Sequence, residues 1–288
     1  MCKAFLWSGQ ASLAGPGRIA WNSVCQSKKA SGLGFKNSLI WIIAAIGKHV
    51  WAVAEKKDNL WVKWFHHDYL KQEDWWNYSA PINSSWYWRK IDEVKGKLRS
   101  LIERLHVHKE DYHISKGYVY IHSPLDKVYW GKEVWGRLNT PKHSFILWLA
   151  IHNRLNTKDR LKRHGVIDQS DCLFCGEAEE SCEHLFFNCH FSLNCYQQIL
   201  QWLNWRTKLT TLKKVIRWIE RASSSSFQKL VFSAVIAALL YNIWKARNDT
   251  LWLGKSMQPE LIVHNTKVSV KNRISYSLPK KISQQDRN

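Results

Sequence analysis

Length, composition and charge define the broad class of this protein. The chain has 288 residues, of which 45% are hydrophobic, so it has ample material for a buried core and is not a disordered protein. Its 43 Lys and Arg residues outnumber its 23 Asp and Glu residues, and the formal charge of +20 makes a polyanion, above all nucleic acid, the first partner to expect. A membrane surface is a weaker expectation, because the basic residues are spread along the chain.

The beginning of the chain bears on the compartment. Residues 1–13 contain a single Lys and no unbroken apolar run, so no secretory signal is predicted and an intracellular location, nuclear or cytoplasmic, is expected. Seven cysteines are an odd number, and in a reducing compartment their clustering favours metal binding over disulfides.

Helices are expected in the first third of the chain after an irregular start over residues 1–38. Apolar residues predict a helix from Leu39 to Glu55, and aromatic residues at helical spacing predict another over Leu60–Lys71. Ser84 or Ser85 can cap a third helix. The apolar residues of this third helix recur every three or four positions between charged ones: Ile91, Val94, Leu98, Leu101 and Leu105.

Aromatic and histidine residues in this region have two interpretations each. Seven tryptophans lie between Trp51 and Trp88, interleaved with Lys, His and Arg, and aromatics beside cations can stack nucleobases. We favour core packing, because Trp at helical spacing is more often buried. The pair His66 and His67 can serve a metal or acid–base role, but a partly exposed helix surface is the preferred interpretation.

Further along, one short β element and several helices are expected. The tyrosines and β-branched residues from Tyr112 to Ile121 predict a short strand or hairpin. Helical spacing resumes after Thr140, and Thr157 can cap a short basic helix, KDRLKRHG, that stops at Gly165. Later helices are expected over residues 192–204, 211–222 and 226–252.

The last third contains the longest apolar run and a basic tail. The run Leu230 to Tyr241 is shorter than the roughly 20 residues that cross a bilayer, so we predict a buried helix and no membrane association. Beyond Pro259, the segment SVKNRISYSLPKKISQQDRN is basic and polar and is expected to be loose at its end.

The most specific pattern in the chain is DCLFCGEAEESCEHLFFNC, residues 171–189. Cys172 and Cys175 have the spacing with which one tight turn directs two thiolates to one metal, and Gly176 supplies the backbone freedom for such a turn. His184 and Cys189 complete a set of three sulfurs and one imidazole. This donor set suits one tetrahedral Zn²⁺ in a closed, structural site without a position for a catalytic water.

Other interpretations of this cluster remain open. The cysteines can be ordinary buried residues, although four spaced ligands are a more specific signal than a lone C-x2-C pair. Cys182 lies two residues before His184 and can replace His184 or Cys189, and His190 and Cys195 are further candidates. The apolar residues Leu185 to Phe187 are expected to turn away from the metal and tie the site to the core.

Residues 134–189 resemble the zinc-binding domain that follows the reverse transcriptase of plant LINE-type, non-LTR retrotransposons. The resemblance implies that Cys172, Cys175, His184 and Cys189 are the zinc ligands. The residues that match the family pattern are Val134-Trp135, Pro141-Lys142, Phe145 to Leu149, Arg154-Leu155, Thr157, Asp159 to Leu161, Gly165, Cys172, Cys175, Glu180, His184 to Phe187 and Cys189.

Flanking segments extend this resemblance. WNSVCQSKKASGLGFKN, residues 21–37, is similar to the segment after the polymerase in this family, although it lacks the usual Pro and the first Gly of a pair, which weakens the local turn. NLWVKWFHHDYL and LLYNIWKARND resemble family segments before and after the zinc site.

Signatures of catalysis are absent from the sequence. A reverse transcriptase binds two Mg²⁺ ions through carboxylates that include an Asp-Asp turn, and the chain has no Asp-Asp pair. The sparse acids form no ribonuclease H set, and there is no GxSxG, P-loop or HExxH motif. We therefore expect that the chain is not an enzyme and that it lacks the polymerase site.

These observations predict a mainly α protein with a small embedded Cys3His zinc knuckle and at most a short β-hairpin. We expect a Trp-rich connection region over 1–110, the zinc-binding domain over 111–205 and a helical region with a basic tail over 206–288. The expected partner is RNA or DNA, bound with low specificity through phosphates, with a reverse transcriptase domain in the same or another polypeptide as a further partner. Lys158, Arg160, Lys162 and Arg163 are the candidate contacts, on a common surface with the knuckle. The alternative is a structural or interaction module, or a translated retroelement remnant with no selected activity.

Overall fold

The chain is mainly helical and forms two compact units. The computed structural model describes residues 2–10, 17–71, 73–122, 125–206 and 210–277. Within these ranges no β-strand is formed, and the only β contact is an isolated bridge between Asp171 and Glu179. One unit is Ala20–Asp126, and the other combines Met1–Ile19 with Lys127–Asn288. We call them the connection unit and the zinc unit.

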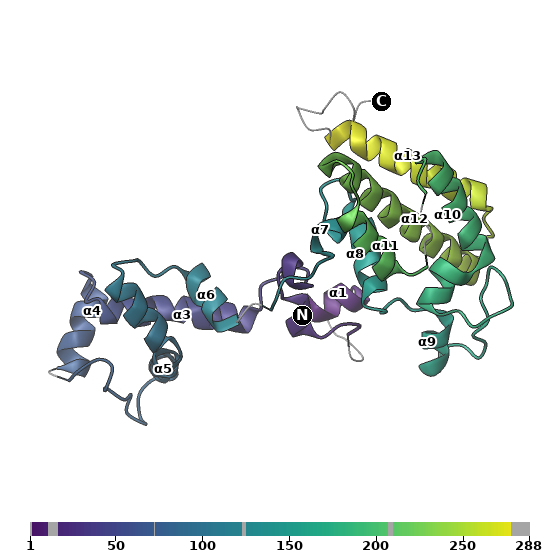
Figure 1. Cartoon of the computed structure of the whole chain (residues 1–288). Coiled ribbons are helices and arrows are strands. Elements are labelled where there is room, and N and C mark those ends of the chain that lie inside the picture. Colours follow the sequence, from purple (N-terminus) through teal and green to yellow (C-terminus); the bar gives the residue numbers. More distant parts are fainter. Residues whose placement is uncertain (1, 11–16, 72, 123–124, 207–209, 278–288) are drawn as a thin grey trace. The chain divides into compact units, whose positions relative to one another are not determined.

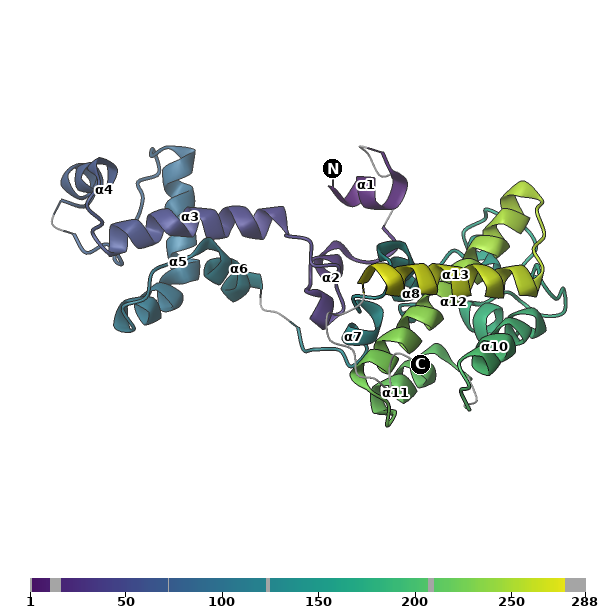
Figure 2. The same ribbon diagram turned by 90° about the horizontal axis from the view of Figure 1, so that it is seen from above.

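The connection unit is built from helices that pack on α3. Its elements are α2 (Trp21–Val24), the 3₁₀ turn η1 (Lys28–Ala30), α3 (Ser38–Ala54), α4 (Leu60–Phe65), the π-helical turn η2 (His66–Leu70), α5 (Trp86–Val107) and α6 (Ile114–His122). Helix α5 crosses α3 and α6 lies alongside it (Figure 2). The apolar stripe predicted on α5 is buried against them, and Ser85, one of the two candidate caps, accepts a hydrogen bond from Trp88 N.

The strand or hairpin expected over Tyr112 to Ile121 is wrong, because this segment forms α6. Tyr112 Oη donates a hydrogen bond to Ala44 O at 2.7 Å, and Tyr118 Oη accepts one from Asn37 N at 3.0 Å. Gly117 lets α6 approach the Tyr112 ring closely, since a Cβ there would collide with it. Packing on α3 therefore overrides the β propensity of the tyrosines.

The Trp-rich span contributes both core and surface residues. Trp75 and Trp88 are buried around the fully buried Phe65, as expected for core residues. In contrast, Trp64 and Trp86 are 49% and 68% exposed.

The two histidines of this span lie on the surface of a helical turn. His66 is half-buried, with Nε2 3.0 Å from Val53 O. His67 is exposed beside Asp68, with Nδ1 2.8 Å from Oδ1. Neither belongs to a cluster of potential metal ligands among the described residues. The preferred interpretation of a helix surface agrees with this placement.

The zinc unit is organised around α12. Its elements are α1 (Cys2–Ser8), α7 (Gly131–Val134), α8 (Pro141–Ile151), α9 (Lys158–Arg163), the π-helical turn η3 (His184–Asn188), α10 (His190–Trp202), α11 (Leu212–Arg221), α12 (Ser226–Leu253) and α13 (Pro259–Ser277). Helices α7, α8, α11 and α13 pack on α12, and α13 also contacts α10 (Figure 1). Helix α12 begins with a capping box formed by Ser225 and Gln228 and ends at Gly254, whose φ of 64° suits glycine.

Helix α12 contains the longest apolar run, as predicted. All residues from 233 to 240 are buried inside the unit. By length and composition alone α12 is long and apolar enough to cross a bilayer, and half of its most apolar stretch is buried inside the protein.

Beyond Pro259, where the sequence predicts a basic tail to the C-terminal helical region, the structure forms a further helix. Residues 259–277 form α13, because Ile262, Val263, Thr266 and Val270 are buried on one face of the helix. The predicted loose end of the tail, residues 278–288, lies outside the described residues.

The division into the segments 1–110, 111–205 and 206–288 remains a prediction from the sequence. The two compact units are defined by spatial packing, and their boundaries fall at other residues. Helix α6 packs on α3, and α12 packs on α8. Each unit thus unites elements that are distant in sequence.

Candidate metal centre

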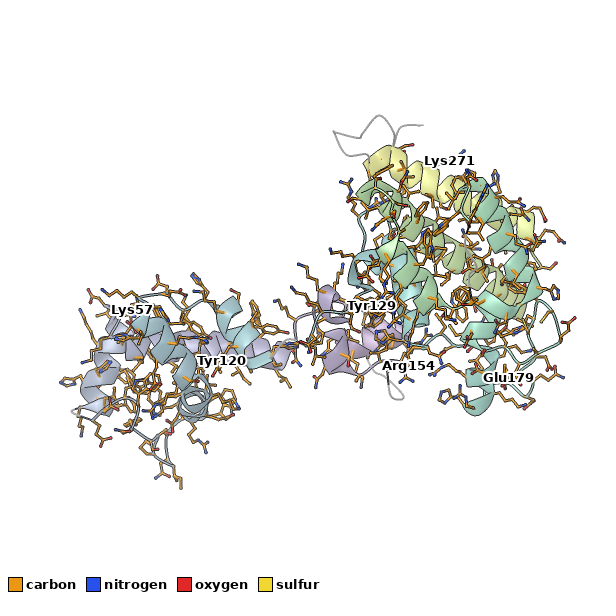
Figure 3. The ribbon with its side chains drawn as sticks, viewed as in Figure 1. Lys57, Tyr120, Tyr129, Arg154, Glu179 and Lys271 are labelled. Atoms are coloured by element: carbon orange, nitrogen blue, oxygen red, sulfur yellow. The ribbon has the colours of Figure 1, made fainter. Side chains whose placement is uncertain are left out.

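A tight turn supplies the first two candidate ligands. Cys172 N donates to Ala178 O at 2.8 Å, and Gly176 N donates to Cys172 O at 2.8 Å. Gly176 has φ 70°, which a side chain would disfavour. The bridge between Asp171 and Glu179, the latter labelled in Figure 3, closes the base of this turn. We call residues 170–180 the knuckle; it directs Cys172 and Cys175 to one side.

The other two candidate ligands lie at the ends of η3. His184 N donates to Ser181 Oγ at 3.0 Å, and Cys189 N donates to His184 O at 2.8 Å. Cys189 is also the N-cap residue of α10. The predicted anchor is confirmed, since Leu185, Phe186 and Phe187 are all buried. Core packing of η3 thereby fixes the positions of His184 and Cys189.

The four residues come together in one cluster. Their potential ligand atoms all lie within 4.8 Å of one another. Cys172 Sγ and Cys189 Sγ are 3.9 Å apart, and Cys175 Sγ lies 3.2 Å from His184 Nε2. Cys172 and Cys189 are buried, whereas Cys175 and His184 are half-buried. The cluster is therefore closed on the core side.

This geometry fits a zinc ion. Tetrahedral Zn²⁺ with Zn–S bonds of about 2.3 Å places its sulfur ligands about 3.8 Å apart. The observed 3.9 Å between Cys172 and Cys189 agrees with that separation. Three sulfurs and one imidazole form a soft donor set that favours Zn²⁺ over oxygen-seeking Mg²⁺ or Ca²⁺.

A hydrogen bond couples the two buried thiols of the cluster. Cys172 donates its S–H to Cys189 Sγ, and this hydrogen bond raises the pKa of Cys172 and lowers the pKa of Cys189. Binding of a divalent cation here would release this proton, because cysteine binds metals as the thiolate.

The alternative ligands lie elsewhere or at the edge of the cluster. Cys182 Sγ lies 3.8 Å from Ala150 O on α8, and burial raises the pKa of Cys182 to about 12. Cys195 Sγ lies 3.9 Å from Pro259 O, and burial likewise raises its pKa to about 12. His190 is exposed, with Nδ1 3.9 Å from Glu177 Oε2, and forms a second, peripheral group with Glu177 and Cys175.

A buried ion pair, which the sequence reasoning missed, joins the knuckle to α12. Glu180 is 0% exposed and Arg247 is 1% exposed. Glu180 Oε1 accepts hydrogen bonds from Arg247 Nε at 2.9 Å and Nη2 at 2.6 Å, and from Lys158 N at 2.9 Å. Glu180 therefore has two roles: it caps the N-terminus of α9, and it holds the knuckle on α12. The available signal was Glu180 itself, which is one of the residues that match the family pattern.

Helix α9 carries the predicted nucleic-acid contacts, and the structure does not place all four on one exposed surface. Lys158 is buried, with 7% of its surface exposed, because it begins α9 directly beside Glu180. Arg160 is half-buried and Nη1 donates to Asn153 O. Lys162 and Arg163 are exposed, and Arg163 Nη2 pairs with Asp159 Oδ2 at 2.8 Å.

The capping of α9 also differs in detail from the expectation. Thr157 is the N-cap residue, as predicted, but its hydroxyl donates to the Asp159 carboxylate and caps no backbone N–H. Glu180 takes over this role through its bond from Lys158 N. Leu161 faces inward and is buried, as expected.

The helical fold and the Cys3His cluster define a helical zinc-binding module. Residues 112–196 match the family model described as zinc-binding in reverse transcriptase, and this stretch holds all four cluster residues together with Glu180. The predicted resemblance is confirmed for this segment at the level of that family. No curated protein and no solved structure matches the chain.

Proposed function

We propose that the chain is the zinc-binding, nucleic-acid-binding C-terminal module of a reverse transcriptase from a plant LINE-type, non-LTR retrotransposon. The observation that carries the proposal is the convergence of Cys172, Cys175, His184 and Cys189 within a segment that matches the reverse transcriptase family. In this role the chain has no polymerase site of its own. It works beside a polymerase domain in the same or another polypeptide.

One structural zinc ion is part of this proposal. Four protein side chains complete a tetrahedral shell, so the site has no position for a reactive water. The cluster joins the knuckle to η3 and the start of α10. When bound, the ion would stabilise these segments against each other.

Low-specificity binding of RNA or DNA is the second part. The formal charge of +20 supports it, since phosphate contacts by Lys and Arg release counterions and dominate non-specific affinity. We expect affinities of about micromolar strength at physiological salt, little sequence preference and a steep dependence on salt.

Binding of zinc-loaded protein to labelled RNA and DNA oligonucleotides at several salt concentrations tests this function. The proposal predicts that the logarithm of affinity falls linearly with the logarithm of salt concentration. Binding that is absent for every oligonucleotide, in protein that retains zinc, would instead favour a structural or interaction module. Incorporation of nucleotides that depends on Mg²⁺ would contradict the expectation that the chain is not an enzyme.

A further inference from the structure

Helix α11 has one apolar face and one basic face. Its apolar face is buried in the zinc unit and consists of Leu212, Val215, Ile216 and Ile219. Its opposite face carries four exposed cations, Lys213, Lys214, Arg217 and Arg221, and one exposed acid, Glu220. Lys213, Arg217 and Arg221 recur every four residues, so they form a stripe with successive members about 6 Å apart along the axis. Successive phosphates of an extended nucleic-acid strand have a similar separation.

The exposed cations of α11 form no ion pairs among the described residues. Some exposed cations of other helices do pair along their own helix: Lys97 with Glu93 on α5, Arg163 with Asp159 on α9, and Lys245 with Asp249 on α12. What distinguishes α11 is that four exposed cations lie together on one short helix. The basic face of α11 thus carries positive charge that the protein itself does not neutralise.

A cavity of about 650 Å³ adjoins this face, between α7, α11 and α12. Its lining includes the lysines Lys127, Lys132 and Lys229 and the aromatic ring of Tyr129, which Figure 3 labels. Arg217 of the stripe lies 4.9 Å from the centre of the Tyr129 ring. The basic stripe of α11 and the cavity are therefore continuous. The volume of the cavity lies within the range of about 300–1,000 Å³ found for small-ligand pockets.

The cavity also contains an unsatisfied polar group. Glu133 and Glu220 line it, and Glu133 Oε2 is buried without a hydrogen-bond partner among the described residues. Burial raises the pKa of Glu133. A buried polar atom without a partner is rare in folded proteins. A ligand with hydrogen-bonding groups on a planar edge would supply that partner.

We propose that the basic face of α11 and the adjoining cavity bind single-stranded nucleic acid. Phosphates contact Lys213, Arg217 and Arg221, and one base enters the cavity and stacks on Tyr129. A single strand is the occupant because its bases are free to stack on an aromatic ring, whereas those of a duplex are not. This proposal rests on the proposed nucleic-acid function and assigns that function to a surface other than α9.

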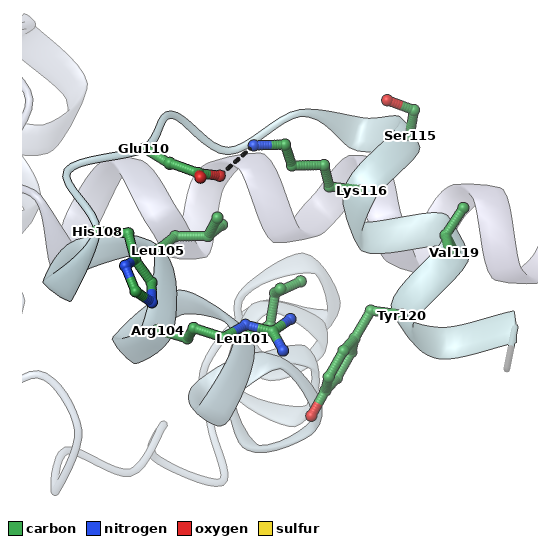
Figure 4. Close-up of a pocket in the computed structure, with 9 residues that line it drawn as sticks. All are labelled: Leu101, Arg104, Leu105, His108, Glu110, Ser115, Lys116, Val119 and Tyr120. Carbon is green, nitrogen blue, oxygen red and sulfur yellow. Dashed lines mark hydrogen bonds and ion pairs between the residues drawn. The ribbon is translucent and has the colours of Figure 1, made fainter.

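The groove between α5 and α6 offers a contrast. It has a volume of about 670 Å³, and its basic residue Lys116 pairs with Glu110 at 2.6 Å (Figure 4). The Tyr120 hydroxyl at its rim is held by Ser100 Oγ. One cation of this groove is thus already neutralised, and its floor is formed by the buried Leu101 and Leu105.

Matched double variants of the full-length, zinc-loaded chain test the assignment. Lys213→Gln/Arg217→Gln and Lys162→Gln/Arg163→Gln each remove two exposed positive charges, the first pair from α11 and the second from α9. Fluorescence anisotropy with a labelled single strand at several salt concentrations gives affinity and salt slope. Loss of two phosphate contacts should reduce the slope by about 1.4 and weaken binding about 25-fold at 0.1 M salt. We expect this effect for the α11 pair and little effect for the α9 pair.

A second variant tests the aromatic contact. Tyr129→Ala should weaken single-strand binding about tenfold and leave the salt slope unchanged, because a lost base stack involves no phosphate. Tyr129→Phe retains the ring and should bind like the parent protein. Duplex affinity should change little in either variant.

The outcomes separate this inference from the function on which it rests. Equal losses in both double variants would mean that only net charge matters, and a loss confined to the α9 pair would restore the surface expected from the sequence; either result overturns the α11 assignment. A parent protein that binds no nucleic acid would overturn the proposed function itself. Zinc content and unfolding temperature should be the same in all variants, since every substituted side chain except half-buried Tyr129 is exposed.

Discussion

At the scale of single residues, the four candidate metal ligands could be selected from the sequence because their spacing encodes local geometry. Cys172 and Cys175 belong to one turn, and His184 and Cys189 to the ends of one helical turn. Only the joining of these two local structures is a tertiary event. The sequence left Cys182 as an alternative, and the structure directs its thiol to Ala150 O, away from the cluster.

Substitution of each cluster residue tests the ligand set. Cys172→Ser, Cys175→Ser, His184→Ala and Cys189→Ser should each lose the metal, because a tetrahedral site with three ligands binds zinc much more weakly. Cys182→Ser should keep it. Zinc content after dialysis is the measurement, and loss of zinc in Cys182→Ser would transfer the ligand role to that residue.

The buried pair of Glu180 and Arg247 could not be predicted from sequence. The two residues are 67 positions apart, and no local pattern links a charge in the knuckle to one in α12. Charged residues are rarely fully buried unless they are paired. Because Arg247 lies between Lys245 and Asp249, its sequence neighbours gave no sign that it is buried.

Breaking this pair should be costly. Glu180→Gln leaves the Arg247 charge buried without a counterion, so we expect a loss of about 3 kcal/mol in the free energy of unfolding. The double variant Glu180→Gln/Arg247→Met should be more stable than Glu180→Gln alone. Lys245→Gln, which breaks a half-exposed pair on the same helix, should cost at most about 1 kcal/mol.

Urea denaturation of the zinc-loaded variants measures these differences. A cost for Glu180→Gln no larger than that for Lys245→Gln would show that the buried pair does not hold the knuckle on α12.

At the scale of elements, the apolar stripe predicted α5, and nearly continuous apolar sequence predicted α3 and the centre of α12. The sequence pattern failed for α6. The residues of that segment favour strands by intrinsic preference, and the helix forms because Tyr112 and Tyr118 bond to α3 and its N-cap. Such long-range contacts carry no signature in a local window of sequence.

Two glycines in the connection unit test the packing of α6. Gly117→Ala should destabilise the protein by about 1–3 kcal/mol, because the new Cβ would collide with the Tyr112 ring, whose hydroxyl is fixed on Ala44 O. Gly96→Ala on α5 is the matched control. Its Cβ meets no atom within 4 Å, so alanine should stabilise the helix by about 0.5–1 kcal/mol.

Thermal or urea unfolding of both variants reads out the difference. Stabilisation by both substitutions would contradict the close contact between α6 and Tyr112.

At the scale of the whole molecule, the metal cluster belongs to one of the two units. All four cluster residues lie in the zinc unit, and the connection unit, Ala20–Asp126, has a core of its own around Phe65 and Leu98. The stabilities of the two units should therefore respond differently to zinc. Sequence resemblance identified the zinc-binding segment but gave no means to divide the chain by packing.

Removal of zinc by a chelator should loosen only one unit. Amides of η3 and α10 should exchange hydrogen faster, because the knuckle and η3 then lose their common anchor. Amides of α3 and α5 should keep their protection. Hydrogen exchange with mass spectrometry measures both, and equal loosening of all four elements would contradict a local role for the metal.

The central claim is that one zinc ion is bound by Cys172, Cys175, His184 and Cys189, and the zinc content of the purified protein tests it most directly. A closed, thiolate-rich site provides on the order of 10 kcal/mol of apparent binding free energy, so the metal should survive purification. Elemental analysis of protein purified without chelators and under reducing conditions should return about one equivalent of zinc per chain. A content far below one equivalent would contradict the claim.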